Sequence, residues 1–150
     1  MNFTDLITED LIALQLEGST REAVMDEMIA MLDASGALVD KEGFKTALYE
    51  RERQSSTGIG FGIAIPHGKT DAVTSARVAF GIKKAGVDWD SMDGDDANLI
   101  FMIAVPEQNA GDDHLKILQL LSRKLMDDEF RASLLEASSK EQVVNLLSEL

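Results

Sequence analysis

Apolar residues follow two different patterns along the chain, and the extended pattern marks the predicted strands. Short apolar runs at residues 11–16 and 63–65 predict strands. Residues 77–83 alternate, as in a strand with one face on the core, and the core-facing side chains are Val78, Phe80 and Ile82. Residues 98–105 are apolar throughout and precede Pro106. This last run is typical of a central strand covered on both faces.

Helical spacing separates the first two strands. Ser19 and Glu22 have the spacing of a capping box for a first helix, and Gly36 is suited to end it. The apolar side chains that share one face of this helix are Val24, Met28, Met31 and Leu32. Asp40 can cap a second helix, which ends near residues 51–54, just before a glycine-rich segment. The inward side chains of the second helix are Phe44, Ala47 and Leu48.

The helical pattern returns after the apolar run. A third helix begins near His114 with an acidic N-terminus, and its apolar stripe comprises Leu115, Ile117, Leu118, Leu121 and Leu125. A fourth helix is indicated by Phe130, Leu134 and Leu135. Ser138 and Glu141 can cap a last helix, which carries Val143, Val144, Leu146 and Leu147. Strands and helices interleave, and this order predicts an α/β fold, specifically an α/β sandwich with a central mixed β-sheet flanked by helices.

Composition narrows the class of protein. A chain of 150 residues suits a single domain spanning residues 1–150. No apolar run approaches the roughly 20 residues that cross a bilayer, and the first residues lack a basic segment, so we expect neither a membrane span nor a secretory signal. With no cysteine, disulfides and thiol chemistry are excluded and the cytoplasm is the expected location. The net charge of −13 disfavours nucleic acid and direct membrane contact, and favours a partner with a basic face.

The sequence Pro66-His67-Gly68 carries the strongest chemical signal. Pro66 keeps the preceding residue extended, and Gly68 permits a sharp turn, so we expect His67 to face a cleft at the end of the 63–65 strand. Such a histidine can act as a nucleophile, a base or a metal ligand. The glycine-rich segment before it is either a plain turn or a loop whose backbone amides approach an anion, which would suit a phosphorylated imidazole.

Several alternative sites lack the spacing that they require. Residues 58–62 miss the G-x-G-x-x-G pattern, and Lys69 is too distant for a Walker loop. In the acidic segment that starts at Asp88, Gly94 falls at position seven of a calcium loop instead of six, and Leu99 stands where glutamate is needed. No zinc-ligand spacing links the two histidines, and no G-x-S-x-G elbow is present. We therefore expect no metal site and no nucleotide site.

Arg51 and His114 each have an ordinary structural interpretation. Arg51 can be a solvated helix end among neighbouring charges, and His114 can be a surface residue or partial cap. A phosphohistidine, however, needs a nearby cation, and a guanidinium offers a fixed fork of donors.

Residues 58–69, Gly-Ile-Gly-Phe-Gly-Ile-Ala-Ile-Pro-His-Gly-Lys, closely resemble the active-site signature of the fructose and mannitol type 2 EIIA domains of the bacterial sugar phosphotransferase system (PTS). The resemblance extends to Arg51, to residues 86–89 and to His114 with Leu115, and so covers essentially the whole chain. Residues 87–90 are similar to the fructose branch. Phe61 replaces the polar residue of many relatives.

This resemblance implies a phosphoryl carrier. His67 would accept a phosphoryl group from the phosphocarrier protein HPr and pass it to a cysteine of an EIIB domain of a sugar permease, without a cofactor. Arg51 would steady the phosphoryl oxygens, and His114 would lie beside His67. By family analogy Nε2 attacks, so Nδ1 is expected to be held by a backbone carbonyl. The hydroxyls of Ser56 or Thr57 are further candidates for assisting, and an acidic surface around the site would suit a basic donor.

Two other functions remain open. One is a regulatory EIIA-like module of the nitrogen type, in which the phosphorylation state of His67 controls partner binding. The other is a metal-dependent hydrolase that uses His67 and His114, which predicts bound zinc. For the carrier we expect transient complexes that bury roughly 1,200 Å² or less.

Overall fold

The computed structural model describes residues 3–108 and 113–150. Its strands are β1 (Ile12–Ala13), β2 (Gly58–Gly60), β3 (Ile63–Ala64), β4 (His67–Thr70), β5 (Arg77–Val87) and β6 (Ala97–Pro106). Its α-helices are α1 (Arg21–Ala34), α2 (Lys41–Gln54), α3 (Asp113–Lys124), α4 (Asp128–Leu135) and α5 (Lys140–Leu147), preceded by two short 3-10 helices, η1 (Phe3–Asp5) and η2 (Glu9–Leu11). Within the described residues, no helix has both the length and the apolar character that a membrane span requires.

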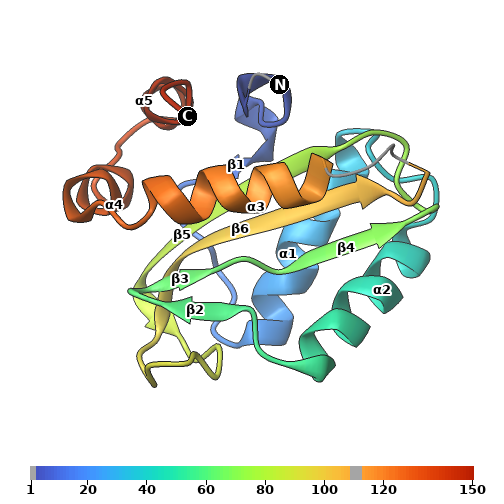
Figure 1. Ribbon diagram of the computed structural model, residues 1–150, viewed down its shortest axis with the longest axis horizontal. Helices are drawn as coiled ribbons and strands as arrows, with labels where there is room; N and C mark the ends of the chain where they lie inside the picture. The colour runs from blue at the N-terminus through green and yellow to red at the C-terminus, as the bar shows by residue number, and fades with distance from the viewer. Residues whose placement is uncertain (1–2, 109–112) are drawn as a thin grey trace.

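The six strands form one mixed sheet, as predicted. β5 and β6 pair antiparallel at its centre, β1 is parallel to β5, and β3 and β4 are both parallel to β6. β2 adds an antiparallel edge beside β3. In Figure 1, α3 crosses the front of the sheet over β6, α1 lies behind the sheet, and α2 lies beside β4. Helices therefore cover both faces, and the α/β sandwich expected from the sequence is confirmed.

The centre of the sheet is buried on both faces. β6 is buried from Leu99 to Val105, which confirms the prediction for the continuous apolar run. The prediction that β5 has one exposed face is wrong, because Ala79 and Gly81 are buried as well. A Cβ built on Gly81 would lie 2.5 Å from Leu16 Cδ1, so the absent side chain is what allows this second layer to pack closely.

Helix ends confirm some capping predictions and shift others by one residue. Asp40 caps α2 by accepting a 3.0 Å hydrogen bond from Gly43 N, and Gly36 follows α1 with φ of +86°. The cap of α1 is Thr20, however, and that of α5 is Ser139, rather than the serines at 19 and 138. In both cases the residue nearer the helix is the last extended one, and only its hydroxyl reaches a first-turn N–H.

The first strand is shorter than predicted. Residues 9–11 form η2, and only Ile12 and Ala13 pair with β5. Leu16 returns to the sheet through a single backbone bond, from its N–H to Ile82 O at 2.9 Å. An apolar run shows that residues are buried, but it does not show which of them have a strand partner within reach.

Candidate functional site

His67 is the first residue of β4, and the chain does not reverse direction there. Ile63 lies opposite Leu99 and His67 lies opposite Ile103, so β3 and β4 run along β6 in one continuous register. Ile103 N donates to Pro66 O at 2.9 Å and carries the ladder across the interruption. The predicted turn at Gly68 is therefore wrong, since this glycine lies within a strand.

Gly68 has a different physical role. A Cβ built on it would lie 3.3 Å from Phe44 Cε1 and 3.5 Å from Leu48 N, both on α2. The bare backbone of β4 therefore lets α2 approach closely. This packing brings the C-terminal half of α2 alongside His67.

The imidazole of His67 is held by the backbone two residues before it. The side chain is half-buried, and its Nδ1 lies 2.8 Å from Ile65 O. A carbonyl oxygen only accepts hydrogen bonds, so Nδ1 carries the proton and the in-plane lone pair resides on Nε2. The carbonyl contact that the family resemblance led us to expect is confirmed.

Arg51 and His67 line the same open groove, of about 470 Å³, between α2 and β4. The groove is lined by Ala47, Glu50, Arg51 and Gln54 of α2 and by His67, Gly68 and Lys69 of β4. Arg51 is half-buried in the last turn of α2, and its Nη1 donates to Ser55 O at 2.8 Å. The sequence places Arg51 at the end of the second helix, just before the glycine-rich segment, and the structure places it beside His67 in the groove between α2 and β4.

Lys69 is a second cation in the groove, and the sequence interpretation gave it no role. Side chains two residues apart on a strand point to the same face, so the placement of Lys69 beside His67 was a readable signal. The groove also contains Glu50, but that carboxylate pairs with Arg53. The groove thus combines an imidazole with two cations.

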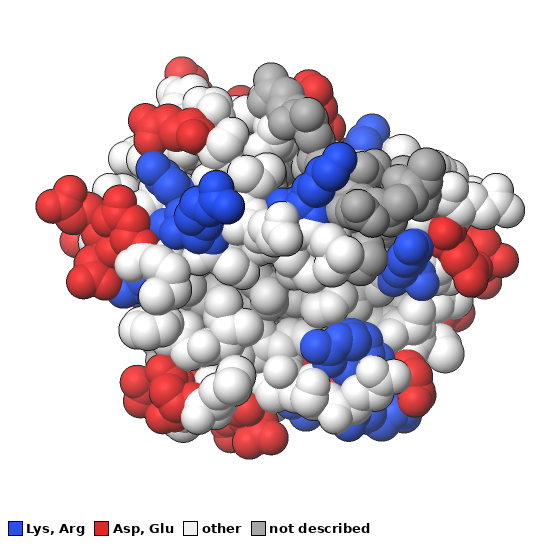
Figure 2. Space-filling view, in the orientation of Figure 1, with Lys and Arg blue, Asp and Glu red and all other residues white. Residues whose placement is uncertain are grey.

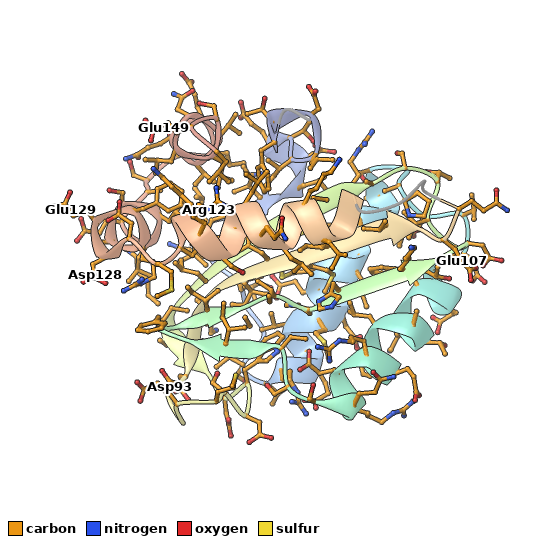
Figure 3. The ribbon with its side chains drawn as sticks, viewed as in Figure 1. Asp93, Glu107, Arg123, Asp128, Glu129 and Glu149 are labelled. Carbon is orange, nitrogen blue, oxygen red and sulfur yellow. The ribbon has the colours of Figure 1, made fainter. Side chains whose placement is uncertain are left out.

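Apart from Glu50, Asp and Glu do not gather around this groove, contrary to the expectation from net charge. Figure 2 shows Lys and Arg around an uncharged centre, with Asp and Glu at the edges of this face. The acids labelled in Figure 3 lie at that rim and are Asp93, Glu107, Asp128, Glu129 and Glu149. Net charge predicts the mean field of a protein but not where its charges gather.

His114 lies in the first turn of α3, as predicted, but its side chain is outside the described residues. Its position beside His67 therefore stays a prediction. Among the described residues, no group of three His, Asp or Glu side chains is placed to hold a metal ion.

The glycine-rich segment does not line the groove. It forms the β2–β3 hairpin, which turns at Phe61 and Gly62 with φ of +58° and +76°, at the left end of Figure 1. Phe61 N donates to Asp93 Oδ2 at 3.0 Å. The backbone N–H groups of Asp95 and Phe61 hold the pKa of Asp93 below its usual value. Of the two interpretations that the sequence left open for this segment, the structure therefore favours the plain turn over the anion-binding loop.

Phe61 links the hairpin to α4. Its side chain is 58% exposed, and the Arg131 guanidinium carbon lies 5.1 Å from the ring centroid. Arg131 also donates to Leu125 O, so the cation is anchored at the end of α3. The aromatic residue that departs from the family pattern makes a cation–π contact far from the groove.

The hydroxyls of Ser56 and Thr57 both form hydrogen bonds within the fold. Ser56 Oγ donates to Trp89 O at 2.6 Å. Thr57 Oγ1 donates to Glu52 Oε1 at 2.6 Å and accepts from Trp89 Nε1 at 3.1 Å. Neither hydroxyl lines the groove, so direct assistance to transfer is not supported.

Comparisons with known proteins find relatives along nearly the whole chain. The family model described as "Phosphoenolpyruvate-dependent sugar phosphotransferase system, EIIA 2" matches residues 5–150. The chain is 46% identical over 149 residues to the PTS system fructose-specific EIIABC component of Bacillus subtilis, covering 99% of this chain and 23% of that protein. It is 43% identical over 153 residues to the PTS system fructose-specific EIIA component of Haloferax volcanii, covering 100% of this chain and 99% of that protein.

Solved structures share the fold over nearly the full length. The nitrogen regulatory protein IIA-Ntr of Neisseria meningitidis superposes with a TM-score of 0.89 at 32% identity, covering 96% of this chain and 97% of that one. Enzyme IIA for mannitol from Escherichia coli, solved in complex with phosphorylated enzyme IIB, has a TM-score of 0.83 at 24% identity, covering 96% and 98%. The chain belongs to the EIIA type 2 family of the phosphoenolpyruvate-dependent sugar phosphotransferase system.

Proposed function

We propose that this chain is the phosphoryl carrier of a fructose-like PTS. His67 accepts a phosphoryl group from the phosphocarrier protein HPr and passes it to a cysteine of an EIIB domain, for coupled sugar uptake and phosphorylation. Residues 1–150 act as one EIIA unit in the cytoplasm. The observation that carries the proposal is the Nδ1 contact with Ile65 O, because it directs the lone pair of His67 to Nε2.

The transfer follows from this tautomer. Nε2 attacks phosphorus in line, a nitrogen–phosphorus bond forms, and the bond from phosphorus to the donor breaks with its electron pair returning to the donor. No proton has to leave Nε2. The ring becomes cationic while it keeps its Nδ1 proton, and the Ile65 carbonyl stabilises that charge by accepting the hydrogen bond. Transfer to EIIB reverses these steps.

Two cations support the phosphoryl group. Arg51 and Lys69 line the groove with His67, so both are placed to offset the charge on the phosphoryl oxygens. The guanidinium supplies a planar pair of donors and the ammonium a mobile point charge. His114 is assigned to the same site by family analogy alone.

The relatives support the fructose-like pathway. Two of them at 46% and 43% identity are named as fructose-specific, and the first carries A, B and C components in one chain. An EIIB domain is therefore the proposed acceptor. The 32% identical neighbour named for nitrogen regulation favours a second candidate, a module whose phosphorylation state controls partner binding.

The test is phosphorylation with defined components. The chain is incubated with phosphoenolpyruvate, the general PTS enzyme and HPr, and the acid-labile, base-stable phosphate is measured on the wild type and on His67→Ala. We expect label on the wild type only, and equal labelling of both proteins would refute the carrier role of His67. Addition of a fructose-type EIIB domain should then discharge the label. Retention of label, with binding to another partner that depends on it, would favour the regulatory candidate.

A further inference from the structure

A buried carboxylate lies directly beside the groove on α2. The side chain of Glu52 is 4% exposed, and Glu52 and Thr57 are the buried polar residues of the described chain. Glu52 Oε2 accepts from Thr57 N and its Oε1 accepts from Thr57 Oγ1, both at 2.6 Å. Trp89 Nε1 donates both to Glu52 Oε1, at 3.3 Å, and to the hydroxyl oxygen of Thr57, at 3.1 Å. A carboxylate is buried in this way only where several donors replace its water.

Thr57 connects this carboxylate to the histidine through the backbone. Ile65 N donates to Thr57 O at 3.0 Å, and Ile65 O lies 2.8 Å from His67 Nδ1. On the other side, Ile103 N holds Pro66 O at 2.9 Å. The carbonyl that selects the tautomer of His67 is therefore held from both directions, by the sheet and by Thr57.

We propose that Glu52 and Thr57 are positioning residues for His67. By clamping the 57–65 backbone pairing, they aim the Ile65 carbonyl at Nδ1 and so keep the lone pair on Nε2. The inference deepens the proposed function and rests on it, because a fixed tautomer matters only if Nε2 is the nucleophile. Neither residue lines the groove, so both act through the backbone rather than by touching the phosphoryl group.

Arg51 gives the clamp a second consequence. It precedes Glu52 on α2, so the carboxylate that binds Thr57 also anchors the helix end that carries the groove cation. Arg21 Nη1 lies 4.0 Å from Glu52 Oε2 and provides partial charge balance. The buried carboxylate of Glu52 therefore helps to fix the positions of both the His67 imidazole and the Arg51 guanidinium.

The decisive measurement is the tautomer of His67 in the folded protein. The chain has two histidines, so selective ¹⁵N-histidine labelling yields a simple spectrum, assigned with the His67→Ala protein. Spectra are recorded where the ring is neutral, for wild type, Thr57→Val and Thr57→Ser. Thr57→Val removes the hydroxyl, and Thr57→Ser restores it.

We expect the Nδ1–H form to predominate in the wild type and in Thr57→Ser. In Thr57→Val the Nε2–H form should become comparable, and the initial rate of His67 phosphorylation should fall by about 10-fold to 100-fold, as is usual when an orienting partner is lost. Glu52→Gln should change both readouts in the same direction. Tyr49→Phe is the matched control on α2, because it removes a hydrogen bond to Asp26 at 2.8 Å without touching this network.

The two readouts separate the failure of this inference from the failure of the carrier function. An unchanged tautomer and rate in folded Thr57→Val and Glu52→Gln, alongside normal wild-type phosphorylation, would overturn the positioning role. A tautomer shift in Thr57→Val with no phosphorylation of the wild type would sustain the positioning role and refute the carrier. Where Glu52→Gln does not fold, Thr57→Val and Trp89→Phe decide the question.

Discussion

Substituting Gly68 tests the packing that places α2 against β4. The first atom of a side chain at this position would lie 3.3 Å from Phe44 Cε1 and 3.7 Å from Ala47 Cβ. Alanine requires Phe44 to give by a few tenths of an ångström, and it recovers about 0.4–1 kcal/mol from the lower entropy of the unfolded chain. We therefore expect the free energy of unfolding of Gly68→Ala to lie within about 1 kcal/mol of that of the wild type.

Valine adds two more carbons to the same contact. Overpacking of this kind costs about 1–3 kcal/mol, so Gly68→Val should be clearly less stable than Gly68→Ala. It should also slow phosphorylation of His67 by about 10-fold or more, because α2 carries Arg51 and small displacements of a positioned group are costly. Trp89 is the single tryptophan and is fully buried, so its fluorescence during urea unfolding reports the stability of each variant.

Gly36 provides the matched control for the turn interpretation. It has φ of +86° and no atom within 4 Å of a built Cβ, so alanine there costs about 1–2 kcal/mol through backbone strain alone. The packing argument is refuted if Gly68→Val is as stable as the wild type. It is equally refuted if Gly68→Ala behaves like Gly36→Ala, since that result would show strain rather than contact.

Charge and pH supply the remaining predictions. Arg51→Ala should slow phosphorylation of His67 by about 10²-fold, and Lys69→Ala should slow it by less. Arg53 is exposed and does not line the groove, so Arg53→Ala should be phosphorylated at the wild-type rate. Equal rates for all three variants would contradict a role of the groove cations in the transfer. Burial, with the Asp26 carboxylate next, raises the pKa of Tyr49. The folded state therefore holds that proton more tightly, so the contribution of Tyr49 to the free energy of unfolding is constant up to the unfolded pKa of about 10 and falls above it. Tyr49→Phe should lose this alkaline component, and an identical alkaline limb in both proteins, measured by urea unfolding, would contradict it.

The sequence was sufficient where neighbouring residues decide the outcome. Asp40 caps a helix because its carboxylate reaches an N–H three residues away, and the continuous apolar run of β6 needs cover on both faces wherever it lies in the sheet. The motif around His67 likewise identified the family and, by analogy, the carbonyl contact of its ring. These features depend on periodicity and on contacts within a few residues.

Only the tertiary structure decided what each glycine and hydroxyl does. Gly68 reads as a turn in the sequence, but it serves the contact with Phe44, because an absent side chain carries no record of what packs against it. Thr57 reads as a loop hydroxyl, yet it is buried between Glu52 and Trp89. Such roles arise when segments distant in the chain meet, and no local pattern encodes that meeting.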